Sequence, residues 1–511
     1  MMLISNMLLP YMFLVSLTLL YFLYILPKFI KNKSKSSPPP GPPGLPFIGN
    51  LHQIDQSTLH IFLWNLTKRY GPIVSLRFGF NRVVVVSSPS LAKEVMKTQD
   101  LLFCDRPLSS TGQRKLTYDG LDIAFSPYGE QWKKMRKIFS HHLFSPKRVQ
   151  SLSHIREDEV ARTMKMIHDL ALSSKEVNLS EMIKNVTIDI TVRVNFGKRY
   201  QEVSGLLDEI QACLVDQHVS DIWPGLPFTR LVDRLLGKTD RLEKCFQELD
   251  SFYQQQIDER LNNDQKHKLH QPNEEEGDDD DVINILLQLA KDELFTITHK
   301  EIRAMLMDVL IAGTDTSAAS VIWAMTSLIK NPKVMKKAQE EVRNVIGKNG
   351  KIREGDHLPK LTYLKAVIKE TMRLYPPTPL LVPREARQDA ILNGFKIKKK
   401  TLVFVNAWAI GRDPKSWENP EEFLPERFLG GCDIDFKGSD FELTPFGAGR
   451  RICPGMSTGV ATVELLLANL LYSFDWGLPD DVRTEDINYD TNAGITMHKK
   501  NELSLRAHVH F

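Results

Sequence analysis

The chain is 511 residues long, with 42% hydrophobic and 25% charged residues. This composition supports a large buried core and excludes a disordered or repetitive chain. The formal net charge of +3 is small for this length, and no basic stretch is interleaved with aromatic residues, so the sequence predicts no nucleic-acid partner. The five cysteines are odd in number and form no C-x-x-C pair, which excludes a disulfide framework and fits a reducing compartment.

The N-terminal segment is typical of a membrane anchor. Leu3 to Leu26 carries no charge and is long enough to cross a bilayer as a helix. A cleaved signal peptide is the alternative, but the segment lacks a basic start and a small-residue cleavage site. Four lysines follow it, which predicts that the rest of the chain lies in the cytosol and that membrane lipid is a partner. They are Lys28, Lys31, Lys33 and Lys35.

The chain after the anchor divides into a linker and one large domain. Prolines between residues 36 and 50 exclude a helix and favour an extended spacer. We therefore expect an anchor over residues 1–27, a basic and proline-rich linker over 28–50, and the catalytic domain over 51–511.

Helical periodicity dominates the domain. Residues 71–89 contain two β-branched runs joined by a Gly-Phe-Asn turn, which predicts a β-hairpin. Residues 127–346 are mostly helical in pattern, interrupted by an acidic run over 273–281 that favours a solvated loop. The sequence therefore predicts a mainly α fold with small β-sheets.

The longest helix signal begins at Thr298, which forms a plausible capping box with Glu301, and continues to about Lys330. Its centre is "AGTDTS", from Ala312 to Ser317, which contains poor helix formers. Asp315 has only apolar neighbours three and four residues away, so its charge needs water, a ligand or a remote base. A kink packed against another element and a site of proton delivery both fit this pattern.

The segment "ELTPFGAGRRICPG", from Glu442 to Gly455, places Cys453 before a helix-like run, with Pro454 expected in the first turn. The positive end of the helix dipole then favours a thiolate at Cys453. Nearby glycines would let the backbone approach a flat ligand closely.

This segment resembles the haem-thiolate signature F-x-x-G-x-R-x-C-x-G of the cytochrome P-450 monooxygenases. The signature is filled by Phe446, Gly449, Arg451, Cys453 and Gly455. "AGTDTS", "KETMR" and "PERF" are similar to three further motifs of that superfamily, in the expected order. The residues around these motifs are similar to those of the plant microsomal branch of the superfamily, whose enzymes act in specialised metabolism. The resemblance implies a triangular, helix-rich haem domain behind an N-terminal transmembrane anchor.

The resemblance also implies roles for individual residues. Cys453 would be the axial ligand of haem b, and Thr316 beside Asp315 would deliver protons to the distal oxygen. Glu370 and Arg373 would join Arg427 in a buried charge network. The haem propionates would be bound by Trp132, Arg136, Arg384 and Arg451. The substrate pocket would be lined by Leu108 to Leu121, the segment near Val219 to Ile222, Ala312, Leu380, Leu381, Val382, and Ala493 to Thr496 with Ile495.

No G-x-G-x-x-G motif follows a strand, so the sequence predicts that electrons from NADPH arrive through a separate protein. The resemblance implies an NADPH-cytochrome reductase, with cytochrome b5 as an additional donor, at the endoplasmic reticulum membrane. Lys133, Lys134 and Lys137 are candidate docking residues or an ordinary solvated helix face. The implied reaction is oxidation, typically hydroxylation, of a small apolar metabolite with O2. Haem-catalysed rearrangement or dehydration without net use of O2, as of a hydroperoxide or an aldoxime, and a haem sensor without chemistry are the alternatives.

Overall fold

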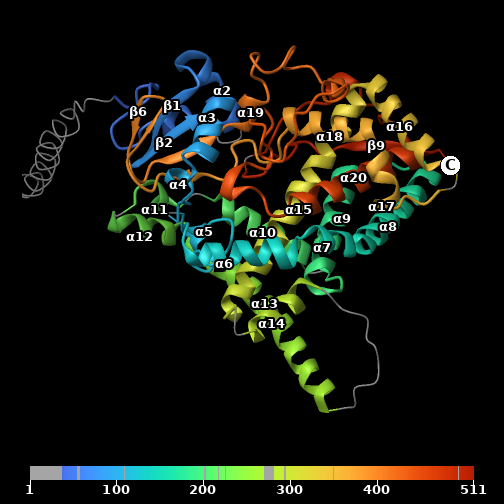
Figure 1. The fold of residues 1–511 in the computed structure, drawn as a ribbon, viewed down its shortest axis with the longest axis horizontal. Coiled ribbons are helices and arrows are strands. Elements are labelled where there is room, and N and C mark those ends of the chain that lie inside the picture. Colours follow the sequence, from blue (N-terminus) through green and yellow to red (C-terminus); the bar gives the residue numbers. More distant parts are fainter. Residues whose placement is uncertain are drawn as a thin grey trace, which may run out of the picture.

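The computed structural model describes residues 37–54, 58–108, 110–200, 203–216, 218–224, 226–269, 281–292, 295–348, 350–492 and 494–510. The predicted anchor over residues 1–27 and most of the acidic run over 273–281 lie outside these residues. The described part is mainly helical with small sheets, as predicted, and its outline in Figure 1 is roughly triangular.

Helices make up most of the described chain. They are α2 (Leu59–Tyr70), α3 (Pro89–Lys93), α4 (Asp100–Phe103), α5 (Thr111–Leu116), α6 (Glu130–Ile138), α7 (Pro146–Ser151), α8 (Ser153–Leu172), α9 (Leu179–Phe196), α10 (Val203–Val215), α11 (Val219–Ile222), α12 (Pro227–Leu235), α13 (Lys238–Leu269), α14 (Val282–Lys291), α15 (His299–Lys330), α16 (Pro332–Ile346), α17 (Glu354–His357), α18 (Thr362–Leu374), α19 (Ala407–Ile410) and α20 (Met456–Ser473).

The strands form two sheets and a separate hairpin. The larger sheet has the order β1-β2-β7-β4, the smaller one β3-β9-β8, and β5 pairs with β6. Their bounds are β1 (Ile73–Phe78), β2 (Asn81–Val86), β3 (Val177–Asn178), β4 (Arg384–Glu385), β5 (Ala390–Leu392), β6 (Phe395–Ile397), β7 (Leu402–Val405), β8 (Phe474–Gly477) and β9 (Ser504–Val509). The antiparallel pairing of β1 with β2 confirms the predicted hairpin.

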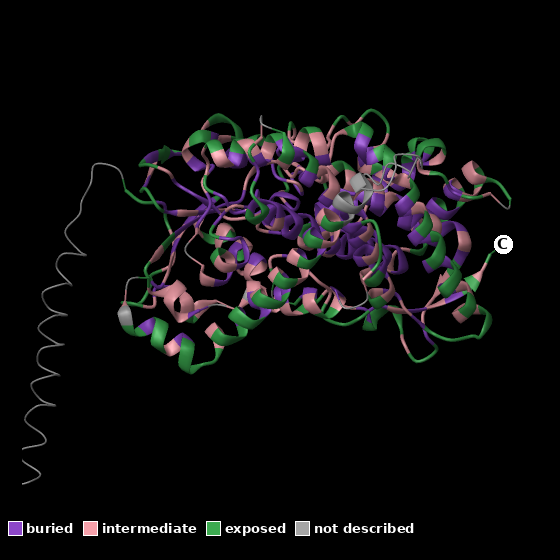
Figure 2. Cartoon of the chain, turned by 90° about the horizontal axis from the view of Figure 1, so that it is seen from below, coloured by how far each residue is buried: buried purple, intermediate pink, exposed green. Residues whose placement is uncertain are grey.

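The central helix α15 organises the core. It begins at the predicted capping box, in which the Thr298 side chain accepts from the Glu301 amide and the Glu301 side chain accepts from the Thr298 amide. Figure 1 shows α15 in the middle of the helical body, with β1, β2, β6, α2, α3 and α19 gathered at one end and β9 at the other, near the C-terminus. Purple, buried residues fill the centre of the chain in Figure 2, and most side chains of α15 belong to them.

One helix of the described residues, α15, is long and apolar enough to cross a membrane by length and composition. Most of its apolar stretch is buried inside the protein, so it serves as a core helix here.

The end of the predicted linker differs from a free spacer. The Ser75 amide donates to the Pro40 carbonyl over 2.8 Å, and the Arg77 amide donates to the Asn50 side chain over 2.8 Å. A Cβ on Gly41 would lie 1.9 Å from the Ser75 carbonyl oxygen, so this close approach requires glycine. Residues 40–50 are therefore docked against β1, because prolines leave their carbonyl oxygens free to accept from an edge strand.

Candidate active site

The loop before α20 presents Cys453 through a tight backbone turn. The Cys453 amide donates to the Phe446 carbonyl over 3.0 Å and closes the loop. Gly447 and Gly449 have φ values of 68° and 70°, which side-chain-bearing residues rarely adopt. A Cβ on Gly449 would lie 1.9 Å from the Met96 carbonyl oxygen. Backbone geometry thus explains the signature glycine Gly449 and its neighbour Gly447.

The start of α20 differs from the prediction. The helix begins at Met456 with Gly455 as its N-cap, so Pro454 lies before the helix and not in its first turn. Burial raises the pKa of the Cys453 thiol, while the Gly455 amide and Arg136 act in the opposite direction. Burial thus opposes the thiolate that the helix start is expected to favour, and the thiolate at Cys453 stays a prediction. A bound metal ion would deprotonate the thiol.

Cys453 lies in the wall of a cavity of about 540 Å³. Phe446 and Gly455 line it beside the cysteine, and a Cβ on Gly455 would meet nothing within 4 Å, which leaves room for a flat ligand against the backbone. The helix α15 contributes Ala312, Gly313, Asp315 and Thr316 to the same cavity. Gly449 is not part of this wall and acts through the loop's shape.

Buried guanidinium groups gather at this cavity. Arg384 pairs with Asp100 over 2.9 Å, and Arg451 donates to the carbonyls of Cys104, Ile123 and Ser126 over 2.9, 3.2 and 2.6 Å. The Trp132 indole donates to the Ile123 carbonyl over 3.1 Å and lies 4.4 Å from the Arg451 guanidinium carbon.

Arg106 is a further member of this arginine group that the sequence analysis missed. It is buried and donates to the carbonyls of Val382 and Pro383 over 2.6 and 2.9 Å. Burial, together with Arg451 and Arg384, lowers the pKa of Arg106. Buried cations that repel one another make a site for anions, and the two carboxylates of a haem fit this requirement.

Arg136 links the arginine group to the cysteine loop. Its guanidinium donates over 2.6 Å to the carbonyl of Ile452, the residue before Cys453. The cysteine, the open face at Gly455 and the arginines therefore fit a flat, dianionic prosthetic group.

The helix α15 is continuous through Ala312 to Ser317. The Thr316 hydroxyl donates to the Ala312 carbonyl over 2.7 Å. The base expected to partner Asp315 is His498, whose Nε2 lies 2.8 Å from Asp315 Oδ1. Gln211 donates to the same oxygen over 2.9 Å. Neither His498 nor Gln211 was singled out from the sequence, because both lie far from Asp315 along the chain.

The walls of the cavity agree with part of the predicted pocket. Ala312, Leu381, Val382 and Ile495 line it. Leu380 does not, because Leu381 has a φ of 51° and the chain turns there, so Leu380 packs with the cluster around Leu63 and Val74.

Two predicted pocket segments lie elsewhere. Residues 108–121 do not line the cavity among the described residues, and Ile123 to Phe125 line it instead. In α11, the Asp221 side chain accepts from the Thr111 amide over 2.8 Å, and the Asp221 carbonyl accepts from the Asn81 side chain over 2.9 Å. These bonds hold α11 against α5 and β2, and α10 forms the cavity wall there. Ala493 lies outside the described residues.

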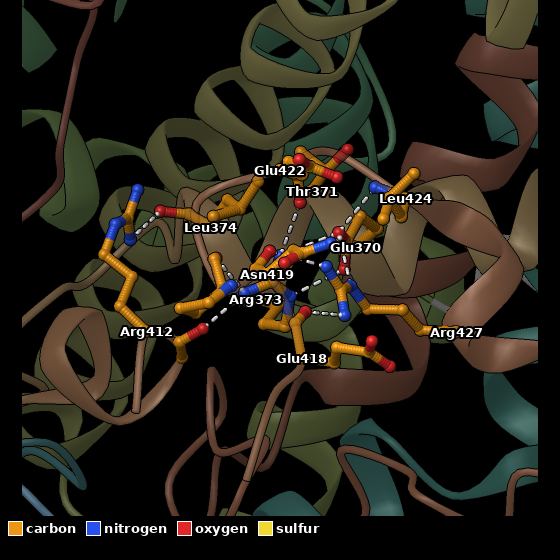
Figure 3. Close-up of polar contacts among 12 residues, drawn as sticks. Glu370, Thr371, Arg373, Leu374, Arg412, Glu418, Asn419, Glu422, Leu424 and Arg427 are labelled. Atoms are coloured by element: carbon orange, nitrogen blue, oxygen red, sulfur yellow. Dashed lines mark hydrogen bonds and ion pairs between the residues drawn. The ribbon is translucent and has the colours of Figure 1, made fainter. Parts of the chain in front are cut away.

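Glu370 and Arg373 are buried outside the cavity and form a charge network with Arg427, which is partly buried (Figure 3). Arg373 donates to the two oxygens of Glu370 over 2.6 and 2.7 Å, and Arg427 lies 3.3 Å from Glu370. Arg373 also donates to the carbonyls of Pro420 and Glu422 over 2.7 and 2.9 Å. The network thus ties α18 to the loop that precedes the cysteine segment.

A helix-rich fold that gathers one cysteine, several buried arginines and a helical acid and alcohol around a single cavity defines a haem-thiolate oxygenase. The family model for cytochrome P450 matches residues 39–505, and the chain belongs to that family. It is a haem-thiolate monooxygenase of specialised metabolism.

The chain is similar to plant enzymes and to a solved animal structure. The chain is 49% identical to 6,7,8-trihydroxycoumarin synthase of Pastinaca sativa, over 92% of this chain and 93% of that protein. It is 47% identical to 5-OH-xanthotoxin synthase of the same plant, over 94% and 95%. A zebrafish cytochrome P450 solved with abiraterone superposes with a TM-score of 0.72 at 25% identity, covering 88% of this chain and 99% of that chain.

Proposed function

We propose that this P450 hydroxylates a small, flat, oxygenated aromatic compound of the coumarin kind. The observation that carries the proposal is the cavity, which joins Cys453 to Thr316. Apart from the buried arginines, its lining is mostly apolar, with a polar corner at Gln211, Asp315 and His498. The two plant relatives are named as synthases of a trihydroxycoumarin and of 5-OH-xanthotoxin, which supports this class of substrate. An apolar wall discriminates by shape, at about 1–3 kcal/mol for a near-isostere, so Leu381 and Ile495 bear on which carbon is attacked.

We assign haem binding to the residues whose chemistry fits the group. Cys453 binds the haem iron, and Arg106, Arg136, Arg384 and Arg451 hold the propionates together with Trp132. When bound, the haem supplies the activation of O2 and the transfer of one oxygen atom, aided by electron donation from the thiolate.

The remaining roles belong to side chains of α15 and the cavity wall. The Thr316 hydroxyl holds a water beside the reacting centre, and the Asp315 carboxyl passes protons toward it. Apolar side chains, Leu381 and Ile495 among them, orient the substrate and keep other water out.

Electrons come from NADPH through a separate reductase, with cytochrome b5 as a second donor. The face of α6 supports docking near Cys453, because Arg136 contacts Ile452 while Lys133 and Lys137 of the same helix are exposed. Lys134 is held by Glu301 over 2.5 Å and is a weaker candidate. The predicted anchor supports a single-pass location in the endoplasmic reticulum membrane, with the catalytic domain in the cytosol.

The test is expression in microsomes with a plant reductase, followed by screening coumarin-type compounds for spectral binding and hydroxylated products. We expect a carbon monoxide difference spectrum of the thiolate type and NADPH-dependent hydroxylation of at least one compound. The Cys453→Ser variant should lose oxygenation, because an alcohol or alkoxide donates electrons to iron more weakly. Product formation that needs no NADPH or O2 would support the rearrangement or dehydration alternative instead.

A further inference from the structure

Three elements that are distant in sequence meet at one carboxylate oxygen. Asp315 Oδ1, on α15, accepts from Gln211 Nε2 of α10 over 2.9 Å and lies 2.8 Å from Nε2 of His498, in the segment before β9. All three side chains line the cavity. They form its polar corner, beside Thr316.

Accessibility differs across the His498–Asp315 pair. The Asp315 side chain is 14% exposed, whereas that of His498 is 37% exposed. A proton that reaches Asp315 through His498 therefore starts from the more accessible side chain of the pair and arrives at the less accessible one. Imidazole suits this step because its two nitrogens can take a proton on one side and release it on the other.

Two other charged groups near the corner interact with partners outside it. Asp208 of α10, which also lines the cavity, is paired with Lys184. Lys499, next to His498, donates to the Asn488 carbonyl over 3.0 Å. Gln211 cannot change its charge, so it fixes the orientation of the Asp315 carboxylate.

We propose that His498 is the positioning residue and proton entry for the Asp315–Thr316 pair. The inference rests on the roles given to Asp315 and Thr316 in the proposed function. In the step, a hydronium ion gives a proton to Nδ1 of His498 and becomes water, while the His498 Nε2–H bond breaks and an O–H bond forms at Asp315 Oδ1. No electrons are transferred, and exchange of the Nδ1 proton with water followed by reprotonation at Nε2 restores the starting tautomer of His498.

The chain offers a matched control. His510 Nδ1 lies 2.9 Å from Asp475 Oδ2, with side chains that are 32% and 51% exposed, and neither residue lines the cavity. His510→Gln removes an imidazole from the same kind of pair without touching the polar corner.

The first experiment uses the membrane-bound enzyme with reductase and xanthotoxin as the probe substrate. It compares wild type, His498→Gln, Asp315→Asn, the double variant and His510→Gln. Glutamine can still donate to Asp315 but cannot relay a proton, so we expect the yield of product per NADPH to fall about tenfold in His498→Gln, with peroxide rising. In the Asp315→Asn background the same change should have little further effect, because His498 acts through Asp315.

The second experiment needs no substrate and no turnover. The infrared stretch of carbon monoxide bound to the reduced protein reports charge in the cavity. The band should shift in His498→Gln and in Asp315→Asn and stay in place in His510→Gln. We also expect the solvent isotope effect on substrate-free NADPH oxidation to change in His498→Gln but not in His510→Gln.

Wild-type coupling with an unchanged carbon monoxide band in His498→Gln would overturn the proposal, as would strictly additive effects of His498→Gln and Asp315→Asn. If xanthotoxin yields no product with wild type, that choice of substrate fails, while the band position and the isotope effect still decide the role of His498.

Discussion

Glu370 shows how a single buried charge is made tolerable. Its carboxylate is fully buried, accepts from Arg373 and from the Leu424 amide over 2.7 Å, and faces Arg427. Such a network is stable while it is complete, and removal of one partner leaves an uncompensated charge in a medium of low dielectric constant.

Glu370→Gln should therefore destabilise the protein by about 3–5 kcal/mol and lower the amount of haem-loaded enzyme. Thermal unfolding and the carbon monoxide difference spectrum measure both effects. Glu422→Gln is the matched control, because that exposed residue contributes only its carbonyl oxygen to the network. Normal melting and full haem content in Glu370→Gln would show that the network is dispensable.

Thr316 is the residue whose hydroxyl is expected to control protons in the cavity. Thr316→Ala should oxidise NADPH at a substantial rate while releasing peroxide or water in place of product. The measurement is the ratio of product to NADPH consumed. Ser320→Ala removes a hydroxyl from the same helix that donates to the Thr316 carbonyl over 2.8 Å and does not line the cavity, so it should keep wild-type coupling.

At the scale of elements, two kinds of local signal account for what could be predicted. The capping box at Thr298 and Glu301 and the turn between β1 and β2 depend on residues close in sequence, and both were predicted correctly. The start of α20 was misplaced because a proline fits both the first turn and the position before a glycine N-cap.

The cysteine loop depends on backbone room at Gly449. Gly449→Ala should abolish haem loading, because a Cβ would collide with the Met96 carbonyl and strain a φ of 70°. Gly355→Ala in α17 is the control, since a Cβ there meets nothing within 4 Å. The readout is haem content per purified protein, and equal loading of the two variants would contradict the role given to this loop.

Over the whole molecule, stability should depend on the ionisation of Glu464 in α20. Burial raises its pKa to about 7, with Glu354 acting in the same direction and Lys365 against it. The unfolded chain ionises this group at lower pH, so the stability that the protonated form contributes is lost as the pH rises from about 4.5 to about 7.

Glu464→Gln removes this pH dependence. The melting temperature of the variant should exceed that of wild type at pH 8, and the difference should shrink toward pH 5. Glu485 is exposed, so Glu485→Gln should have the melting temperature of wild type at every pH. A constant difference between Glu464→Gln and wild type at every pH would assign the effect to packing alone.

The boundary of the catalytic domain gives a last prediction. Deletion of residues 1–33 should leave a haem-binding protein, since the family match begins at residue 39 and the docked segment begins near Pro40. The carbon monoxide spectrum of the truncated protein measures this. It should still associate with lipid vesicles through exposed apolar side chains such as Phe228, Leu231 and Leu235. If the truncated protein were soluble but bound no haem, the anchor would be part of the fold.

The sequence by itself determined the family, the cysteine, the central helix and the Glu370–Arg373 pair, because motifs, caps and helical spacing are short-range patterns. Only the tertiary structure decided that His498 and Gln211 meet Asp315, that Arg106 joins the buried arginines, and that Leu380 turns away from the cavity beside Leu381. Those contacts join segments that are far apart along the chain or depend on one backbone angle. They are set by how the helices pack and how the chain turns, and no local pattern encodes either.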